Sequence, residues 1–215
     1  MKNKLDYELD YWLKRKTIEG ELKNSHYEYF YTTHFGLTKA FYRSKIVLDI
    51  GCGPRGSLEW ADVAKERIGL DPLCKSYLSL GAQRHSMVYV AAPGENMPFA
   101  NNFFDVVCSF NSLDHVDNLH KTVTEIIRVI KPEGFFLLLT DVNHHPTHCE
   151  PVCFSFDVVN LFYKNMRLVK CDHYEKKAGG MYESILENIS YDHQDSTKRY
   201  GILSAMFIKI YEPTL

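Results

Sequence analysis

Three glycines and two aspartates lie where ligands bind in proteins built on parallel sheets. Gly51, Gly53 and Gly56 follow an apolar run, and a residue without a Cβ lets the chain turn sharply and approach a ligand closely. Asp49 precedes the glycines, and Asp71 ends the next apolar run, twenty positions after Gly51. A carboxylate at that place accepts hydrogen bonds from both hydroxyl groups of a ribose. The pattern therefore predicts a site for a nucleoside-type cofactor.

Two classes of cofactor fit this spacing, because it also satisfies the fingerprint of dinucleotide-binding proteins. A pyrophosphate needs free backbone N–H groups, and Pro54 removes one of them from the turn. Asp49 would add negative charge near the phosphates, whereas it would suit the ammonium group of a methionine moiety. Both residues favour S-adenosylmethionine. An NAD-dependent oxidoreductase and a non-catalytic cofactor-binding protein remain the alternatives.

The elements that must position these residues follow the pattern of a doubly wound, Rossmann-like α/β fold. From residue 45 onward, short apolar runs alternate with helical segments, which is typical of βαβ units. We expect an N-terminal helical cap or lid over residues 1–44 and a cofactor-binding domain over residues 45–215. Strands are predicted at 46–50, 67–70, 87–91, 104–110, 135–140, 167–173 and 202–211. Helices are predicted at 5–18, 26–43, 57–66, 118–131 and 156–163.

Five segments between residues 45 and 140 resemble the motifs of class I S-adenosylmethionine-dependent methyltransferases. The first two are similar to the glycine-rich motif and the acidic ribose motif of that family. The third is similar to the segment that covers the adenine and enters the fourth strand. The last two resemble the stretch that lines the methyl-donor pocket and the turn that follows it. In chain order the segments are 47–53, 69–72, 94–107, 109–116 and 128–134.

The resemblance implies a seven-stranded, mostly parallel sheet with an antiparallel last strand. It also implies that S-adenosylmethionine is the cofactor. Many relatives carry an aspartate where this chain has Pro93, so we expect adenine recognition by backbone groups near Gly94 or by the Glu95 side chain. The predicted cofactor-binding residues are Asp49, Gly51, Cys52, Gly53, Asp71, Pro72, Gly94, Glu95, Asn96, Phe110, Asn111 and Tyr27.

Histidines supply the candidate base for methyl transfer to a weak nucleophile. His115 follows the fourth predicted strand, with Asp114 beside it, and histidine is the side chain best tuned to accept a proton at neutral pH. His115 and Asp114 are therefore the predicted catalytic residues. The loop after the fifth strand offers further candidates, and an aromatic segment before the sheet offers a lid over the cofactor. These are His144, His145 and His148 in the loop, and His26, Tyr27 and Tyr31 in the lid.

Charge and composition restrict the partners. The net charge is -2, so nothing attracts the chain to nucleic acid or to an anionic membrane. We expect a small-molecule acceptor, with a sugar or glycan precursor as the leading candidate. No apolar leader opens the sequence, and the six cysteines form no C-x-x-C pair, so we expect a cytoplasmic protein with free thiols and no metal site.

Overall fold

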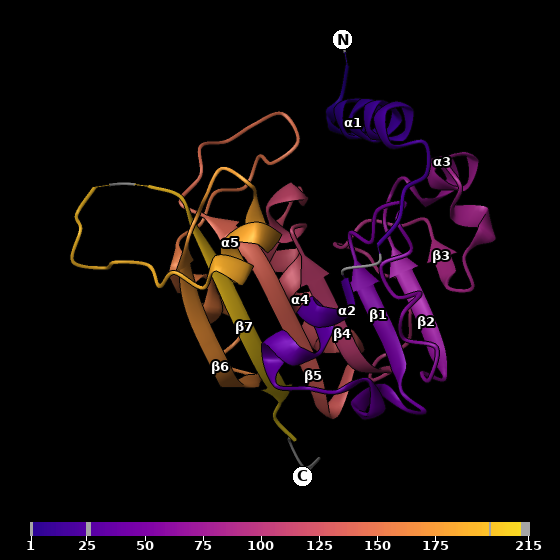
Figure 1. Cartoon of the computed structure of the whole chain (residues 1–215). Coiled ribbons are helices and arrows are strands. Elements are labelled where there is room, and N and C mark those ends of the chain that lie inside the picture. Colours follow the sequence, from indigo (N-terminus) through magenta and orange to yellow (C-terminus); the bar gives the residue numbers. More distant parts are fainter. Residues whose placement is uncertain (1, 25–26, 198, 212–215) are drawn as a thin grey trace.

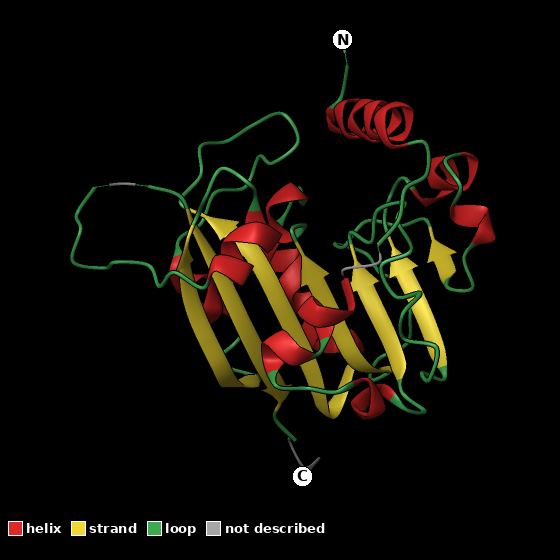
Figure 2. Cartoon of the chain, viewed as in Figure 1, coloured by secondary structure: helices red, strands yellow, loops and turns green. Residues whose placement is uncertain are grey.

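The computed structural model describes residues 2–24, 27–197 and 199–211. Its centre is a seven-stranded sheet in the order β3-β2-β1-β4-β5-β7-β6 (Figures 1 and 2). The strands are β1 (Ile46–Ile50), β2 (Glu66–Leu70), β3 (Val88–Val90), β4 (Phe104–Phe110), β5 (Ile130–Val142), β6 (Met166–Glu175) and β7 (Gly201–Lys209). All seven predicted strands are confirmed.

The direction of the strands also follows the prediction. β1 pairs in parallel with β2 and β4, and β4 pairs in parallel with β5. β7 inserts between β5 and β6 and runs antiparallel to both. The carboxyl ends of β1, β2, β4 and β5 therefore meet at one edge of the sheet, where a doubly wound fold binds its ligands.

Alternate residues of each central strand build a core on either face of the sheet. Leu48 of β1 and Leu138 of β5 pack on one face, against the helix α4 (Leu119–Val129). Their neighbours Val47 and Leu137 pack on the other face, against aromatic residues from the segment before β1. This alternation follows from the two-residue period of a strand, and it makes three layers with the sheet in the middle.

The N-terminal segment begins with a capped helix, α1 (Lys4–Glu19). Asn3 caps its first turn in a reciprocal capping box with Asp6, and Gly20 ends it with φ of 73°. No residue of α1 is fully buried. Figure 1 shows α1 beyond the carboxyl ends of β1 and β2, apart from the layered core.

The predicted helix over 26–43 is wrong as a continuous element. Its described part forms α2 (Tyr27–Tyr31) and two 3₁₀ turns, Thr33–Phe35 and Lys39–Tyr42. Gly36 takes the left-handed conformation, with φ of 72°, and ends the first turn. The breaks let Phe30, Phe35 and Tyr42 all face the sheet, which a straight helix of that length would not allow.

The predicted helix over 57–66 is also wrong, because residues 51–65 form successive turns. Gly56 has a φ of 71°, and the Ser57 hydroxyl donates to the buried Asp49 carboxylate, so local polar bonds and a left-handed residue compete with a helix start. Two other helices differ in extent. α4 ends at Val129, and the 156–163 prediction is a 3₁₀ turn over Phe156–Leu161.

Two short helices were not predicted, α3 (Cys74–Ser79) and α5 (Met181–Glu187). α5 packs Met181 and Ile185 on the same face of the sheet as α2. All six cysteines are free thiols, as expected. Within the described ranges, none of the helices combines the length and the apolar character needed to span a membrane.

Candidate functional site

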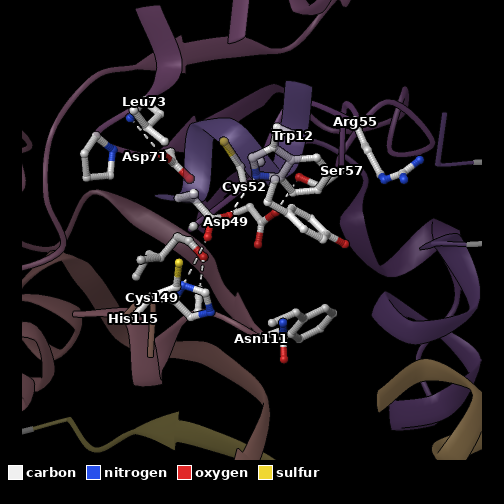
Figure 3. A pocket seen from close by; sticks show the side chains of 18 of the residues that line it. Trp12, Asp49, Cys52, Arg55, Ser57, Asp71, Leu73, Asn111, His115 and Cys149 are labelled. Atoms are coloured by element: carbon white, nitrogen blue, oxygen red, sulfur yellow. Dashed lines mark hydrogen bonds and ion pairs between the residues drawn. The ribbon is translucent and has the colours of Figure 1, made fainter. Parts of the chain in front are cut away.

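A cavity of about 1150 Å³ lies at the carboxyl ends of β1, β2 and β4. The structure brings together there nearly all the predicted cofactor-binding residues. Figure 3 shows the side chains of Asp49, Asp71 and His115 around one space, although they come from three different strand ends. The predicted residues that line it are Asp49, Gly51, Cys52, Gly53, Asp71, Pro72, Gly94, Glu95, Phe110, Asn111, Tyr27 and His115. Asn96 and Asp114 are not among the lining residues.

The glycine loop after β1 forms the floor of the cavity, and its neighbours leave little space for a side chain at Gly51 or Gly53. Gly51 and Gly53 have φ values of 69° and 56°, a conformation that L-residues rarely adopt. A Cβ on Gly51 would overlap the side chain of Ser112, and a Cβ on Gly53 would lie 3.1 Å from the ring of Trp12. The Ser112 hydroxyl donates to the carbonyl of Ile50 at 2.7 Å and so ties the loop to the end of β4.

Asp49 is a buried carboxylate on the wall of the cavity. The Tyr31 hydroxyl donates to its Oδ2 at 3.0 Å, and the Ser57 hydroxyl donates to the same oxygen. Burial raises the pKa of Asp49 to about 7, although both hydrogen bonds oppose that rise. A ligand cation next to Asp49 would favour its charged form, so the residue suits an ammonium group.

Asp71 directly follows β2 and lines the same cavity, beside Leu73 (Figure 3). Its Oδ1 accepts a hydrogen bond from the backbone N–H of Leu73 at 2.8 Å, which fixes the carboxylate toward the cavity. Burial raises its pKa to about 6, so the carboxylate is largely ionised at neutral pH. An ionised carboxylate here can accept hydrogen bonds from a diol.

The segment predicted to meet the adenine has a structural task as well. Oε1 of Glu95 accepts hydrogen bonds from the backbone N–H groups of Asp117 and Asn118, at 2.5 and 2.9 Å, and so secures the start of α4. A Cβ added to Gly94 would lie 3.1 Å from the methyl group of Thr122 and 3.7 Å from the side chain of Ile50. The roles of Glu95, Gly94 and Asn96 toward adenine stay predictions.

Helix α1 lines one side of the cavity with residues that were not part of the site predicted from the sequence. Trp12 lies against the glycine loop, and its indole N–H donates to Glu8 at 2.8 Å. Arg55 contacts the face of Trp12 and pairs with Glu19 at 2.7 Å. Trp12 and Glu8 are four residues apart and therefore share one helix face. That spacing predicts that the two side chains lie together, and only the fold shows that they face the cavity.

A cluster of ionisable groups lies at the other end of the cavity, where Asp114 and His115 form a short turn after β4. His115 Nε2 lies 3.9 Å from Asp114 Oδ1 and 3.8 Å from Glu150 Oε1. His144 Nε2 lies 3.6 Å from Asp114 Oδ2. Burial lowers the pKa of His115 and raises that of Asp114 to about 7. The structure thus joins the predicted catalytic pair to Glu150, from the loop after β5.

The remaining predicted residues are the loop histidines and the aromatic residues of the lid, and only some of them line the cavity. His145 and His148 are exposed, and His148 stacks on Tyr7 of α1, with ring centroids 4.9 Å apart. Tyr27 and Tyr31 both line the cavity. His26 lies outside the described residues.

The turns after the glycine loop bear on the choice of cofactor. A dinucleotide fold places its pyrophosphate at the N-terminus of the helix that follows the first strand. No helix occurs between β1 and β2, a stretch that the structure describes completely. The loop therefore lacks the helix dipole on which the dinucleotide alternative depends.

Comparison with known proteins shows that part of the chain is similar to methyltransferases. Residues 48–138 match the family model described as a methyltransferase domain. A sterol 4-C-methyltransferase of Caenorhabditis elegans is 34% identical over 99 residues, which are 42% of this chain and 29% of that protein. A malonyl-[acyl-carrier protein] O-methyltransferase of Enterobacter lignolyticus is 35% identical over 95 residues, 44% of this chain and 38% of that protein.

Solved structures agree on the fold. The N-methyltransferase NodS from Bradyrhizobium japonicum superposes with a TM-score of 0.60 at 12% identity, covering 83% of this chain and 93% of that one. The matches to the two curated relatives span well under half of their lengths, and the acceptors in their names differ from each other. The matched segment, the strand order and the glycine loop together support a class I S-adenosylmethionine-dependent methyltransferase domain that includes residues 48–138.

Proposed function

We propose that this chain transfers the methyl group of S-adenosylmethionine to a small acceptor molecule inside the cavity. The observation that carries the proposal is that one cavity joins the cofactor residues Asp49 and Asp71 to the cluster around His115. In this proposal Asp71 binds the ribose hydroxyls, and Asp49 binds the ammonium group of the methionine moiety. The backbone of Gly51 and Gly53 comes close to the methionine moiety because no Cβ intervenes.

The acceptor belongs at the end of the cavity where polar side chains gather. His115, Thr147 and Glu150 line that end, and each can form a hydrogen bond with a hydroxyl or amine group. The cavity exceeds the usual range of ligand pockets, about 300–1000 Å³, so it has room for an acceptor beside the cofactor. These features support O- or N-methylation of a sugar or glycan precursor.

Positioning and proton removal are the two tasks of the protein. Because the sulfonium is already a reactive methyl donor, holding the acceptor in line with it supplies most of the acceleration. His115, whose lowered pKa keeps its imidazole neutral, is the proposed proton acceptor, with Asp114 as its neighbour. We expect His115→Ala to lower the turnover number more than the affinity for the cofactor.

We also propose that residues 1–44 form a cap or lid over the cofactor-binding domain of residues 45–215. We infer that α1 is the movable part of the lid, because it covers the glycine loop without any fully buried residue. The segment from Tyr27 to Tyr42 instead supplies aromatic side chains to the core on one face of the sheet.

Thermal unfolding with and without ligands tests the cofactor. S-Adenosylhomocysteine, the product of methyl transfer, should raise the melting temperature at concentrations well above its dissociation constant, since a ligand that binds only the folded state stabilises it. NAD at the same concentration is the comparison. Stabilisation by NAD alone would contradict the proposal.

A further inference from the structure

Three side chains near the acceptor end of the cavity have buried polar atoms without partners. Oδ1 of Asp114, Nε2 of His115 and Nε2 of His144 are all buried and, among the described residues, form no hydrogen bond. Asp114 is 1% exposed and His144 is 5% exposed. Burying a polar atom without a partner is unfavourable, and burying a charge without one is more so. Two unpartnered imidazole nitrogens beside one unpartnered carboxylate oxygen point to a bound group that satisfies all three atoms.

The two distances from His115 to the other members of the cluster are short enough for ligands around one cation. Nε2 of His115 lies 3.9 Å from Asp114 and 3.8 Å from Glu150, which is too far for a hydrogen bond. One ligand atom from each of these three residues lies within 4.8 Å of the other two. Two donors at about 2.1 Å from the same ion are roughly 3.4 Å apart at a tetrahedral angle and at most about 4.2 Å apart.

The backbone and the neighbouring groups orient each donor toward the centre. The backbone N–H of Val152 donates to the carbonyl of Asp114 at 3.2 Å, which holds the loop after β5 against the turn after β4. The Thr147 hydroxyl donates to Oε2 of Glu150 at 3.1 Å, while Oε1 faces His115. The ring Nδ1 of His115 lies 3.7 Å from Glu8, so its Nε2 is the nitrogen that faces the cluster.

His144 has the same orientation. Its Nδ1 lies 3.0 Å from the carbonyl of His145, which can only accept, so Nδ1 carries the proton and Nε2 presents a lone pair. That lone pair points at Asp114 Oδ2, and two electron-rich atoms face each other there unless something positive lies nearby. An imidazole held through Nδ1 by a carbonyl, with Nε2 free, is the usual arrangement beside a metal ion.

We propose that Asp114, His115 and Glu150 bind one divalent first-row transition cation such as Zn²⁺, with His144 adjoining as a further donor. Imidazole nitrogen together with carboxylate oxygen favours such ions over Mg²⁺, which prefers oxygen alone in octahedral geometry. The carboxylates of Asp114 and Glu150 supply the negative charge that balances the cation. Lys4 does not neutralise them by direct contact, since it donates to the carbonyl of His115 and to Asp117.

The histidines and cysteines of the 144–153 loop lack the regular spacing of metal ligands, so the sequence predicted no metal site. Two of the three ligands come from a different element, the turn after β4, and only the fold brings them to Glu150. Three protein ligands leave coordination positions open, and His115 and Glu150 both line the cavity. Where the proposed function holds, an acceptor hydroxyl can take such a position, and the cation then lowers the pKa of that hydroxyl so that its proton leaves to solvent. His115 would then act as a ligand and not as the proton acceptor.

Titration of the whole chain with cations tests the site, and no methyl donor is needed. The chain is first treated with a chelator to remove bound metal, and the chelator is then removed. We expect calorimetry to show one equivalent of Zn²⁺ bound, and Co²⁺ to develop the ligand-field absorption of a protein-bound ion. Glu150→Gln keeps the shape of the side chain and removes its charge, so it should weaken binding by at least about tenfold. Asp114→Asn should do the same.

Matched controls separate this site from other histidines and carboxylates. His145→Asn changes an exposed histidine of the same loop, and Glu187→Gln changes an exposed carboxylate of α5, so both should bind the cation as the unchanged chain does. His173 and His193 form a second pair, with ring nitrogens 2.9 Å apart. Binding lost in His193→Asn and kept in Glu150→Gln would overturn the proposal.

Two further results would also overturn it. One is the absence of any stoichiometric binding of Zn²⁺ or Co²⁺, which would mean that protons alone satisfy the cluster. The other is binding of Mg²⁺ in preference to both. Each result leaves the proposed function standing if S-adenosylhomocysteine still stabilises the chain, so the two proposals fail separately.

Discussion

Burial changes the acid–base properties of single carboxylates that line this cavity. Asp49 and Asp71 are both carboxylates whose pKa values burial raises, to about 7 and about 6, yet their surroundings differ. Two hydroxyl groups hold Asp49, and a backbone N–H holds Asp71. Each carboxylate is thus oriented before a ligand arrives, and a ligand that carries a positive charge or a diol stabilises the ionised form.

Asp71→Asn should weaken binding of S-adenosylhomocysteine by about tenfold to a hundredfold, since hydrogen bonds to a charged group contribute about 1.5–3 kcal/mol. Isothermal titration calorimetry measures the change. Asp62→Asn is the matched control, because Asp62 is an exposed aspartate that pairs with Lys39 away from the cavity. Equal affinities for Asp71→Asn and the unchanged chain would remove Asp71 from the cofactor site.

Affinity for S-adenosylhomocysteine should rise between pH 6 and pH 8. Asp49 has a pKa of about 7 in the ligand-free protein, so it holds a proton below that pH and loses it above. Only the ionised carboxylate attracts the ligand ammonium, and the affinity should therefore fall by up to about tenfold per pH unit below 7. Calorimetry across this range measures the dependence. In Asp49→Asn the dependence near pH 7 should disappear, and a profile unchanged by that substitution would assign the titration to another group.

At the scale of elements, the strand ends supply one side of the cavity. Helix α1 and the two loops at the acceptor end supply the residues on its other sides. Lys4 at one end of α1 donates to the carbonyl of His115 at 2.6 Å, and Glu19 at the other end pairs with Arg55. The helix thus spans the cavity and contacts both the glycine loop and the acceptor cluster. A polar, half-exposed contact of this kind suits an element that opens for ligands.

Trp12→Ala should weaken binding of S-adenosylhomocysteine severalfold while the melting temperature of the ligand-free chain changes little. The reason is that Trp12 covers Gly53 but α1 contributes no fully buried residue to the fold. Leu13→Ala, an adjacent residue that is 46% exposed, is the control. A loss of folding in Trp12→Ala would instead show that α1 is part of the core.

Strands were more predictable from the sequence than the segments between them. Residues 104–110 form β4 as predicted, because a mainly apolar run with β-branched and aromatic residues leaves few alternatives to a buried strand. The 57–66 helix failed because Ser57 bonds to Asp49, a contact that exists only once β1 is in place. Glu8 and Glu150 escaped the prediction for the same reason. They approach His115 from an earlier helix and a later loop, and no spacing along the chain encodes that meeting.

At the scale of the whole molecule, the sheet carries the site by keeping four strand ends in fixed register. Both faces of the sheet are covered, and Phe104, Phe136, Phe162 and Phe207 are fully buried. Phe136 packs against Phe162 and Phe207, with ring centroids 5.0 and 6.0 Å away. The stability of this core is what permits the irregular glycine loop and the unpartnered polar cluster at its edge.

Phe136→Ala should lower the free energy of unfolding by about 3–5 kcal/mol, the usual cost of removing a fully buried aromatic side chain. Denaturant unfolding followed by fluorescence measures it. Tyr163→Ala, which truncates an aromatic ring that is 46% exposed, should cost much less. Similar losses in the two variants would mean that the face around Phe162 is not the packed core described here.

Methyl transfer itself is the most direct test of the central claim. The chain, incubated with S-adenosylmethionine carrying a labelled methyl group and a small-molecule extract, should move label into a metabolite, and Asp71→Asn and His115→Ala should reduce that transfer. The same incubation with S-adenosylhomocysteine in excess should suppress it. Failure of label to enter any metabolite, from a chain that binds S-adenosylhomocysteine, would contradict the account and leave a cofactor-binding protein without methyltransferase activity.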